Sequence, residues 1–228
     1  MTDTGFSLKT SQIKEEKSGD NRPVAEEKPS MGKEEGLEGL GRIGYCFTGS
    51  YCTLQRSFEV LRGLVKRGAR VLPIMSENVY YTDTRFARCE EFSRRVEELT
   101  GQSIIRTVTE AERLGPAVPL DLLIVAPCTG NTLAKVANGI TDTAATMAIK
   151  AHLRCDRPLI LALATNDAMS QNLSNLGRML SRKSVYFLPM KQDSPDGKPH
   201  SLVAEFEMME QAIAALRHGK QLRPLFLV

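Results

Sequence analysis

The sequence has little histidine, no tryptophan and no closely paired cysteines. Its 228 residues include five cysteines and three histidines, and no two cysteines form a C-x-x-C pair. Scattered thiols in an odd number argue against a disulfide framework and against a structural zinc site, and they favour a reducing cytoplasm. No histidine lies at metal-ligand spacing from another, so we expect no metal site.

Two further absences concern membranes and nucleic acids. No apolar run approaches the ~20 residues that a membrane span requires, and the first residues show no secretory signal core. We therefore expect a cytoplasmic protein without a membrane partner. The net charge is only +3, and the basic residues neither form a block nor alternate with aromatic residues. This pattern predicts no nucleic-acid partner, whereas a small anion would suit a mildly basic chain.

The first forty residues differ in composition from the rest. Residues 1–40 carry nine acidic and six basic side chains and show no sustained apolar period. Such a segment buries too little apolar surface to offset its ordering entropy, so we expect a disordered N-terminal tail. Residues 41–228, which carry the remaining net charge of +6, form the predicted folded domain.

From Arg42 onward, short apolar runs alternate with helical periodicities. Apolar runs typical of buried strands occupy residues 42–48, 69–75, 103–108, 121–126, 158–164 and 185–190. Apolar side chains at three- and four-residue steps predict helices over 51–64, 86–99, from 132, from 143, over 173–180 and over 201–217. The alternation predicts a single Rossmann-like or flavodoxin-like three-layer α/β domain, with a mainly parallel sheet of about six strands.

In such folds, ligands bind beyond the carboxyl ends of the strands. The segment "FTGSYCT" lies in such a position, because it follows the first predicted strand. Gly49 allows close backbone approach, Ser50 offers a hydroxyl, and Tyr51 opens a helix whose free N–H groups suit an anion. The stretch is neither a dinucleotide fingerprint nor a P-loop, because it has one glycine and no following lysine. A capped helix without a ligand is the alternative.

The segment "PCTGNTLAK" follows the fourth predicted strand. Pro127 ends the strand, Gly130 relaxes the backbone, and Asn131 and Thr132 offer a donor, an acceptor and a helix cap. Cys128 could be a nucleophile, but no histidine precedes it anywhere in the chain to act as its base. We therefore interpret Cys128 as a small packing residue.

Two more segments follow strands. "SENVYYTDTRF" combines polar side chains with Arg85, which is either a surface charge or a clamp for a carboxylate or phosphate. Lys135, the one charge early in the helix after Pro127, is a second candidate for binding an anionic substrate. In "TNDAMSQN", Asn166 could face a ligand or simply cap the next helix.

Together these segments resemble a known family. "APCTGNTLAKVANGITD" resembles the Pro-x-Ser-x-Asn-Thr signature of the flavin-binding, cysteine-decarboxylase-like family, and "TGSYC" and "ATNDAM" stand where its members carry a phosphate loop and an Ala-Met-Asn segment. The resemblance covers residues 41–190 and implies that the chain binds FMN. We assign to the cofactor Gly49, Ser50, Tyr51, Ser76, Pro127, Cys128, Thr129, Gly130, Asn131, Thr132 and Asn166. We assign to the substrate Asn78, Thr82, Arg85 and Lys135.

The stretches "TDTRF", "MAIKAHLR" and "YFLPMKQD" resemble one branch of this family. That resemblance implies that the chain acts together with a dehydrogenase-like partner subunit that uses NAD(P). The two subunits would form a pyridine dicarboxylate from a small dicarboxylate substrate during sporulation. It also implies a place in the mother-cell cytoplasm and a homo-oligomer whose flavin sites lie between neighbouring subunits.

Two departures from the family concern decarboxylation. The family's decarboxylases carry a histidine before the fourth strand and a cysteine near the C-terminus, whereas "EAERLGPAVPLD" and "KQDSPDGKPHSLVAEF" contain neither. We therefore expect an oxidoreductase subunit, since forming an aromatic pyridine from a dihydropyridine removes two hydrogens that a flavin or NAD(P) can accept. A stand-alone FMN-dependent decarboxylase or prenyltransferase, and a non-catalytic scaffold subunit, remain alternatives.

Overall fold

The computed structural model describes residues 41–228, so the predicted tail of residues 1–40 lies outside the described residues. Seven strands in this part of the chain form one sheet. They are β1 (Arg42–Phe47), β2 (Arg70–Met75), β3 (Leu122–Cys128), β4 (Leu159–Thr165), β5 (Val185–Phe187), β6 (Met190–Lys191) and β7 (Leu202–Ala204).

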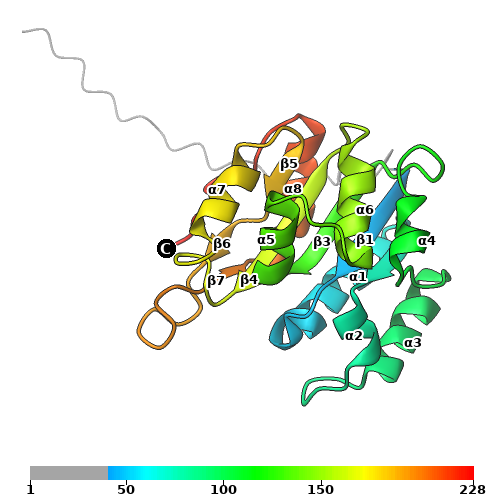
Figure 1. Cartoon of the computed structure of the whole chain (residues 1–228), viewed down its shortest axis with the longest axis horizontal. Coiled ribbons are helices and arrows are strands. Elements are labelled where there is room, and N and C mark those ends of the chain that lie inside the picture. The colour runs from blue at the N-terminus through cyan, green and yellow to red at the C-terminus, as the bar shows by residue number, and fades with distance from the viewer. Residues whose placement is uncertain (1–40) are drawn as a thin grey trace, which may run out of the picture. The chain divides into compact units, whose positions relative to one another are not determined.

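The strand order is typical of flavodoxin-like folds. The parallel strands follow the order β2-β1-β3-β4-β5, and β7 pairs antiparallel with the end of β4 and with β6. Every side chain of β3 is buried, because helices cover the sheet on both faces. The predicted three-layer α/β fold is therefore confirmed (Figure 1).

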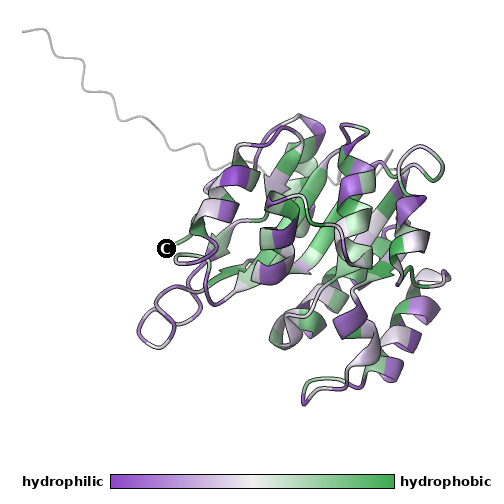
Figure 2. Cartoon of the chain, in the orientation of Figure 1, coloured by the Kyte–Doolittle hydropathy of each residue, from purple (hydrophilic) through white to green (hydrophobic). Residues whose placement is uncertain are grey.

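Helices on the two faces bury separate apolar clusters. The helices are α1 (Leu54–Lys66), α2 (Glu77–Tyr81), α3 (Cys89–Thr100), α4 (Val108–Glu112), α5 (Gly130–Ala137), α6 (Ala144–Leu153), α7 (Leu173–Leu180) and α8 (Met209–Arg217), with 3₁₀ turns at Tyr51–Thr53 and Phe206–Met208. Residues of α1, α2, α3 and α8 join one cluster, and residues of α4 to α7 join the other. Figure 2 shows the apolar strands between helices whose outer sides are polar.

The structure corrects three secondary-structure predictions. Residues 103–108 form no strand: Ile105 makes a single bridge to Ile74, and a capping box between Thr107 and Glu110 starts α4 instead. The predicted last helix begins only at Met209, because residues 202–204 form β7. The predicted strand 185–190 divides into β5 and β6.

A buried histidine on α6 makes the fold sensitive to pH. His152 is fully buried; its Nε2 donates to the Pro158 carbonyl oxygen at 2.8 Å, and its Nδ1 has no partner among the described residues. Burial lowers the pKa of His152 below its ordinary value of 6.5, and the charge of Arg157 lowers it further, against smaller opposing effects of the Pro158 hydrogen bond and Asp121. The folded chain therefore holds this imidazole neutral.

We predict that acidification destabilises the protein through His152. Below about pH 6.5 the unfolded chain protonates this side chain before the folded chain does, so the free energy of unfolding falls as the pH falls. The loss is up to about 1.4 kcal/mol for each unit by which the pKa is lowered. Denaturant titrations at pH 7.5 and 5.5 should show a smaller pH effect for His152→Gln, whose amide can still donate to Pro158.

His200→Gln is the matched control, because His200 lies in an exposed loop. An unchanged pH dependence in His152→Gln would contradict the prediction.

Candidate functional site

Two adjoining cavities open at the carboxyl ends of the central strands. The chain leaves β1 toward α1 on one face of the sheet and leaves β3 toward α5 on the other, so a crevice forms between these neighbouring strands. One cavity, here called the switch-point cavity, has a volume of about 260 Å³. The other, the β4-side cavity, has a volume of about 440 Å³, and both are lined by Gly49, Thr129 and Asn131.

Thr48 joins the two sides of this crevice. Its side chain is buried at the end of β1; its Oγ1 donates to the Pro127 carbonyl oxygen at 2.8 Å and accepts from the Thr129 N–H at 3.0 Å. The turn that begins α5 is thereby held against the end of β1.

The first turn of α5 is seated against the neighbouring strand β4. The Thr129 side chain caps the helix by accepting from the Thr132 N–H at 3.1 Å. A Cβ atom on Gly130 would lie 2.5 Å from Thr165 Oγ1 and 2.7 Å from Asp167 Oδ1, so only glycine allows this approach. Gly130 is therefore needed for close packing, whereas a Cβ on Gly49 would make an ordinary 3.6 Å contact with the Tyr51 ring.

The switch-point cavity contains an unpaired buried hydroxyl. Ser76 follows β2 and is 9% exposed, and its Oγ has no hydrogen-bond partner among the described residues. Glu77 beside it accepts the backbone N–H of Ala144 at 3.1 Å. A buried polar atom without a partner is costly, and Ser76 is one of the residues that line this cavity, so its hydroxyl is a candidate to hydrogen-bond a ligand there.

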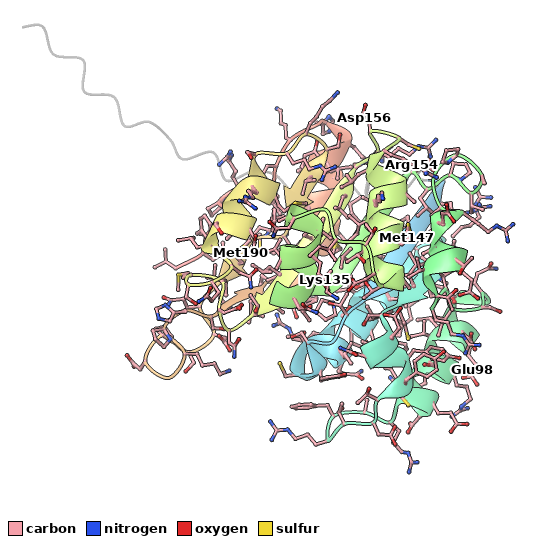
Figure 3. All side chains as sticks on the ribbon, in the orientation of Figure 1. Glu98, Lys135, Met147, Arg154, Asp156 and Met190 are labelled. Carbon is pink, nitrogen blue, oxygen red and sulfur yellow. The ribbon has the colours of Figure 1, made fainter. Side chains whose placement is uncertain are left out.

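One cation reaches the same cavity. Lys135 projects from α5 (Figure 3), and its Nζ lies 2.8 Å from Asp142 Oδ2. The hydrogen bond from Lys135 lowers the pKa of Asp142. Because Asp142 is largely exposed, this pair can open to let Lys135 meet an anionic ligand at small cost.

The β4-side cavity also receives polar side chains from the end of β4, from the loop after it and from the loop between β6 and β7. Asp167 accepts from Thr165 Oγ1 at 2.5 Å and from Asn172 Nδ2 at 2.9 Å, which fixes its carboxylate. Across the cavity, Lys198 Nζ lies 2.9 Å from Asp193 Oδ2. A hydrogen bond from Ser201 and the neighbouring Lys198 lower the pKa of Asp193.

The structure brings most of the predicted site residues together. The switch-point cavity is lined by Gly49, Ser76, Asn78, Thr129, Asn131, Thr132 and Lys135, and the β4-side cavity by Gly49, Ser50, Thr129, Gly130, Asn131 and Asn166. Convergence of the strand ends explains why segments far apart in sequence meet here.

Five predicted residues lie elsewhere. Tyr51 stands behind the cavity wall and donates its hydroxyl to the Asn78 carbonyl oxygen at 3.0 Å. Pro127 does not end the strand as predicted: β3 continues to Cys128, because a register shift between Val125 and Cys128 accommodates the proline. Its carbonyl oxygen accepts from Thr48. Thr82 and Arg85 lie in an exposed loop, where the guanidinium stacks 4.7 Å from the Phe86 ring centroid.

The fifth, Cys128, belongs to the apolar core of the α5–α6 face. Burial raises its pKa to about 12, so the thiol stays protonated near neutral pH. A protonated, enclosed thiol suits a packing residue and not a nucleophile.

Sequence reasoning missed several residues of the two cavities. Thr48 had a usable signal, because it directly follows a buried strand. Glu77 had the same signal, because it lies between the predicted residues Ser76 and Asn78. Thr143, Asp193 and Lys198 also line the cavities, but they come from segments whose positions depend on the tertiary fold. Among residues 41–228, no group of three or more His, Cys, Asp or Glu side chains could hold a metal ion, and no helix is long and apolar enough to span a bilayer.

The chain is similar in sequence and in fold to several known proteins. The chain is 42% identical over 186 residues to the B subunit of dipicolinate synthase from Bacillus subtilis (strain 168), covering 82% of this chain and 93% of that protein. The crystal structure of the B subunit of dipicolinate synthase from Bacillus halodurans matches with a TM-score of 0.76 at 37% identity, over 83% of this chain and 97% of that one. A dodecameric FMN-dependent UbiX-like decarboxylase from Escherichia coli O157:H7 shares the fold, with a TM-score of 0.55 at 24% identity over 65% and 79% of the two chains.

The family predicted from the sequence segments is confirmed. The model of the Flavoprotein family matches residues 32–216, which include both cavities and all the residues that line them. The chain belongs to the Flavoprotein family.

Proposed function

We propose that this chain is the B subunit of a dipicolinate synthase and that it binds FMN at the crevice between β1 and β3. Dipicolinate is pyridine-2,6-dicarboxylate. The similarity to the B subunits of two dipicolinate synthases over most of the chain supports the assignment. For the binding site, the observation that carries the proposal is the unpaired Ser76 hydroxyl, because a buried hydroxyl without a partner gains a hydrogen bond when a ligand supplies one.

The residues of the crevice fit a flavin nucleotide. The Gly130 and Asn131 N–H groups at the start of α5 have no acceptor within the helix and suit a phosphate or a ring carbonyl oxygen, whereas the Thr132 N–H is taken by the Thr129 cap. Ser76 and Thr132 add hydroxyls, and Asn131 offers both a donor and an acceptor where the two cavities meet. Gly130 lets the α5 backbone approach the Thr165 and Asp167 side chains closely.

The proposed chemistry removes two hydrogens from a dihydropyridine dicarboxylate. If the substrate is the hydroxytetrahydro form, loss of one water comes first and gives the dihydro form. Loss of two electrons and two protons then gives the aromatic ring, with NAD(P)⁺ on the partner subunit or FMN as acceptor. Bound FMN would supply a two-electron acceptor beside the substrate.

This chain's own residues orient the substrate in the proposal. Lys135 and Lys198 are cations at opposite sides of the joined cavities, and each can turn from its present carboxylate partner toward a substrate carboxylate. Asp167, held by Thr165 and Asn172, is placed to accept a proton from the ring. Arg85 lies outside the cavities and contributes to the substrate site only if its loop closes inward.

The wider setting is proposed from the same similarity. A dipicolinate synthase B subunit implies a partner A subunit, which we take to be dehydrogenase-like and to carry NAD(P). The dodecameric relative supports a homo-oligomer for this chain. The dipicolinate product supports a role during sporulation in the mother-cell cytoplasm.

We predict that Ser76→Ala weakens FMN binding by about three- to tenfold, because one hydrogen bond to the ligand is lost. The free variant should unfold at the same temperature as the parent protein or higher, since Ser76 Oγ has no partner there. Titration of flavin fluorescence and thermal unfolding measure the two effects. Ser93→Ala, which changes a buried serine of α3 that lines neither cavity, is the matched control; equal flavin affinity in Ser76→Ala and Ser93→Ala would reject the flavin assignment.

We predict further that dipicolinate forms rapidly only when this chain and its partner subunit are mixed. In that assay Lys135→Gln should raise the KM for the dicarboxylate about tenfold through loss of a charge-assisted hydrogen bond, while flavin content stays unchanged. Lys66→Gln, at the exposed end of α1, should behave as the parent. Full activity of the partner subunit alone, unchanged by adding this chain, would overturn the assignment.

A further inference from the structure

Two adjacent arginines that the proposed function does not use lie at the amino ends of β1 and β2, whereas the crevice lies at the carboxyl ends of the strands. Arg42 begins β1 and Arg70 begins β2, and the two residues are paired in register on these parallel strands. Side chains at paired positions point to the same face, and neighbouring strands lie ~4.8 Å apart. Like charges directly opposite each other destabilise a sheet, so this arrangement needs an explanation.

A cavity of about 430 Å³ adjoins the pair. Its polar lining comes from Arg42, Arg70, Thr100 and Gln102. The remaining lining residues are apolar: Ala69, Val71, Leu72 and Val118. Cations and hydrogen-bonding groups beside an apolar wall suit a small anion that has a flat hydrocarbon or heteroaromatic body.

No acidic side chain neutralises the two guanidinium groups among residues 41–228. The ion pairs of this part of the chain include neither arginine. The neighbouring Asp121 is engaged elsewhere: its Oδ2 accepts the backbone N–H of Arg42 at 2.7 Å, and its Oδ1 lies 4.0 Å from Arg157. Within the described domain, the cavity therefore presents two positive charges that can bind an anion.

We propose that Arg42 and Arg70 form a second binding site, for a small planar dicarboxylate. Each planar guanidinium can bind one carboxylate through two parallel hydrogen bonds, and the ring between the carboxylates can lie against the apolar wall. The six residues of β1 separate this site from Thr48 by ~20 Å, at about 3.3 Å per residue. A ligand bound here is too far from the crevice to react, so this site binds the dicarboxylate without converting it.

The choice of a dicarboxylate rests on the proposed function, whereas the site itself rests on the arginine pair and its cavity. Calorimetric titration of the whole chain with pyridine-2,6-dicarboxylate, without flavin or partner subunit, tests it. Arg42→Gln/Arg70→Gln should lose one binding event per chain, or weaken it at least tenfold, with unchanged flavin affinity. Lys135→Gln should keep this binding event.

Arg62→Gln/Arg94→Gln is the matched control, because it removes the same charge from exposed positions on α1 and α3. Pyridine-2-carboxylate, which lacks one carboxylate, should bind the parent at least tenfold more weakly at this site. The proposal is overturned if the parent does not bind the dicarboxylate, if both double variants lose affinity equally, or if the two probes bind equally well.

The titration separates this proposal from the proposed function. A chain that makes no dipicolinate with its partner would end the functional assignment but leave this binding result intact. Conversely, binding unaffected by the loss of Arg42 and Arg70 would remove this site and leave the flavin titrations unchanged.

Discussion

The crevice depends on two hydrogen bonds made by one buried hydroxyl. Thr48 directly follows β1, and its Oγ1 donates to the Pro127 carbonyl oxygen and accepts from the Thr129 N–H. Because Thr129 also caps α5, the Thr48 side chain fixes the start of that helix relative to β1. The loop after β1 and the first turn of α5 line both cavities, so the shape of the site follows from this one contact.

Close packing on the other side of α5 adds a second constraint. Gly130 lies so near Thr165 and Asp167 that a larger residue fits only if those side chains move. The helix start is therefore held between β1, through hydrogen bonds, and β4, through steric contact. A helix N-terminus held on two sides keeps its N–H groups in fixed positions, which lowers the ordering cost of binding an anion there.

Much of the sheet could be predicted from the sequence because buried parallel strands leave a plain signal. Residues 42–48, 121–126 and 158–164 are apolar without alternation, and they form β1, β3 and β4. Residues 103–108 contain Ile104, Ile105 and Val108, but Thr107 can cap a helix, and that local hydrogen bonding decides the outcome. Leu202 and Phe206 fit a helical face as well as they fit β7 and the turn after it, so periodicity alone could not separate the two.

The location of the candidate site was predictable because the parallel strands were, but several residues that line the site were not. Segments that follow parallel strands must converge, which brings Ser76, Asn131 and Asn166 to one edge of the sheet. Side chains from loops follow no such rule. Arg85 points away on an exposed loop, whereas Lys198 reaches the cavity from a loop with no distinguishing pattern.

Two side chains at the ends of β2 do not help to stabilise the free chain: a hydroxyl without a hydrogen-bond partner at one end and an arginine that faces a like charge at the other. Ser76, just after it, buries a hydroxyl without a partner among the described residues, at a cost of about 1–3 kcal/mol. Arg70, at its start, faces Arg42 across the neighbouring strand. Local stability alone would favour alanine at position 76 and a neutral residue at position 70. Departures from local stability are expected where a protein binds something, so these two positions are best explained by ligands.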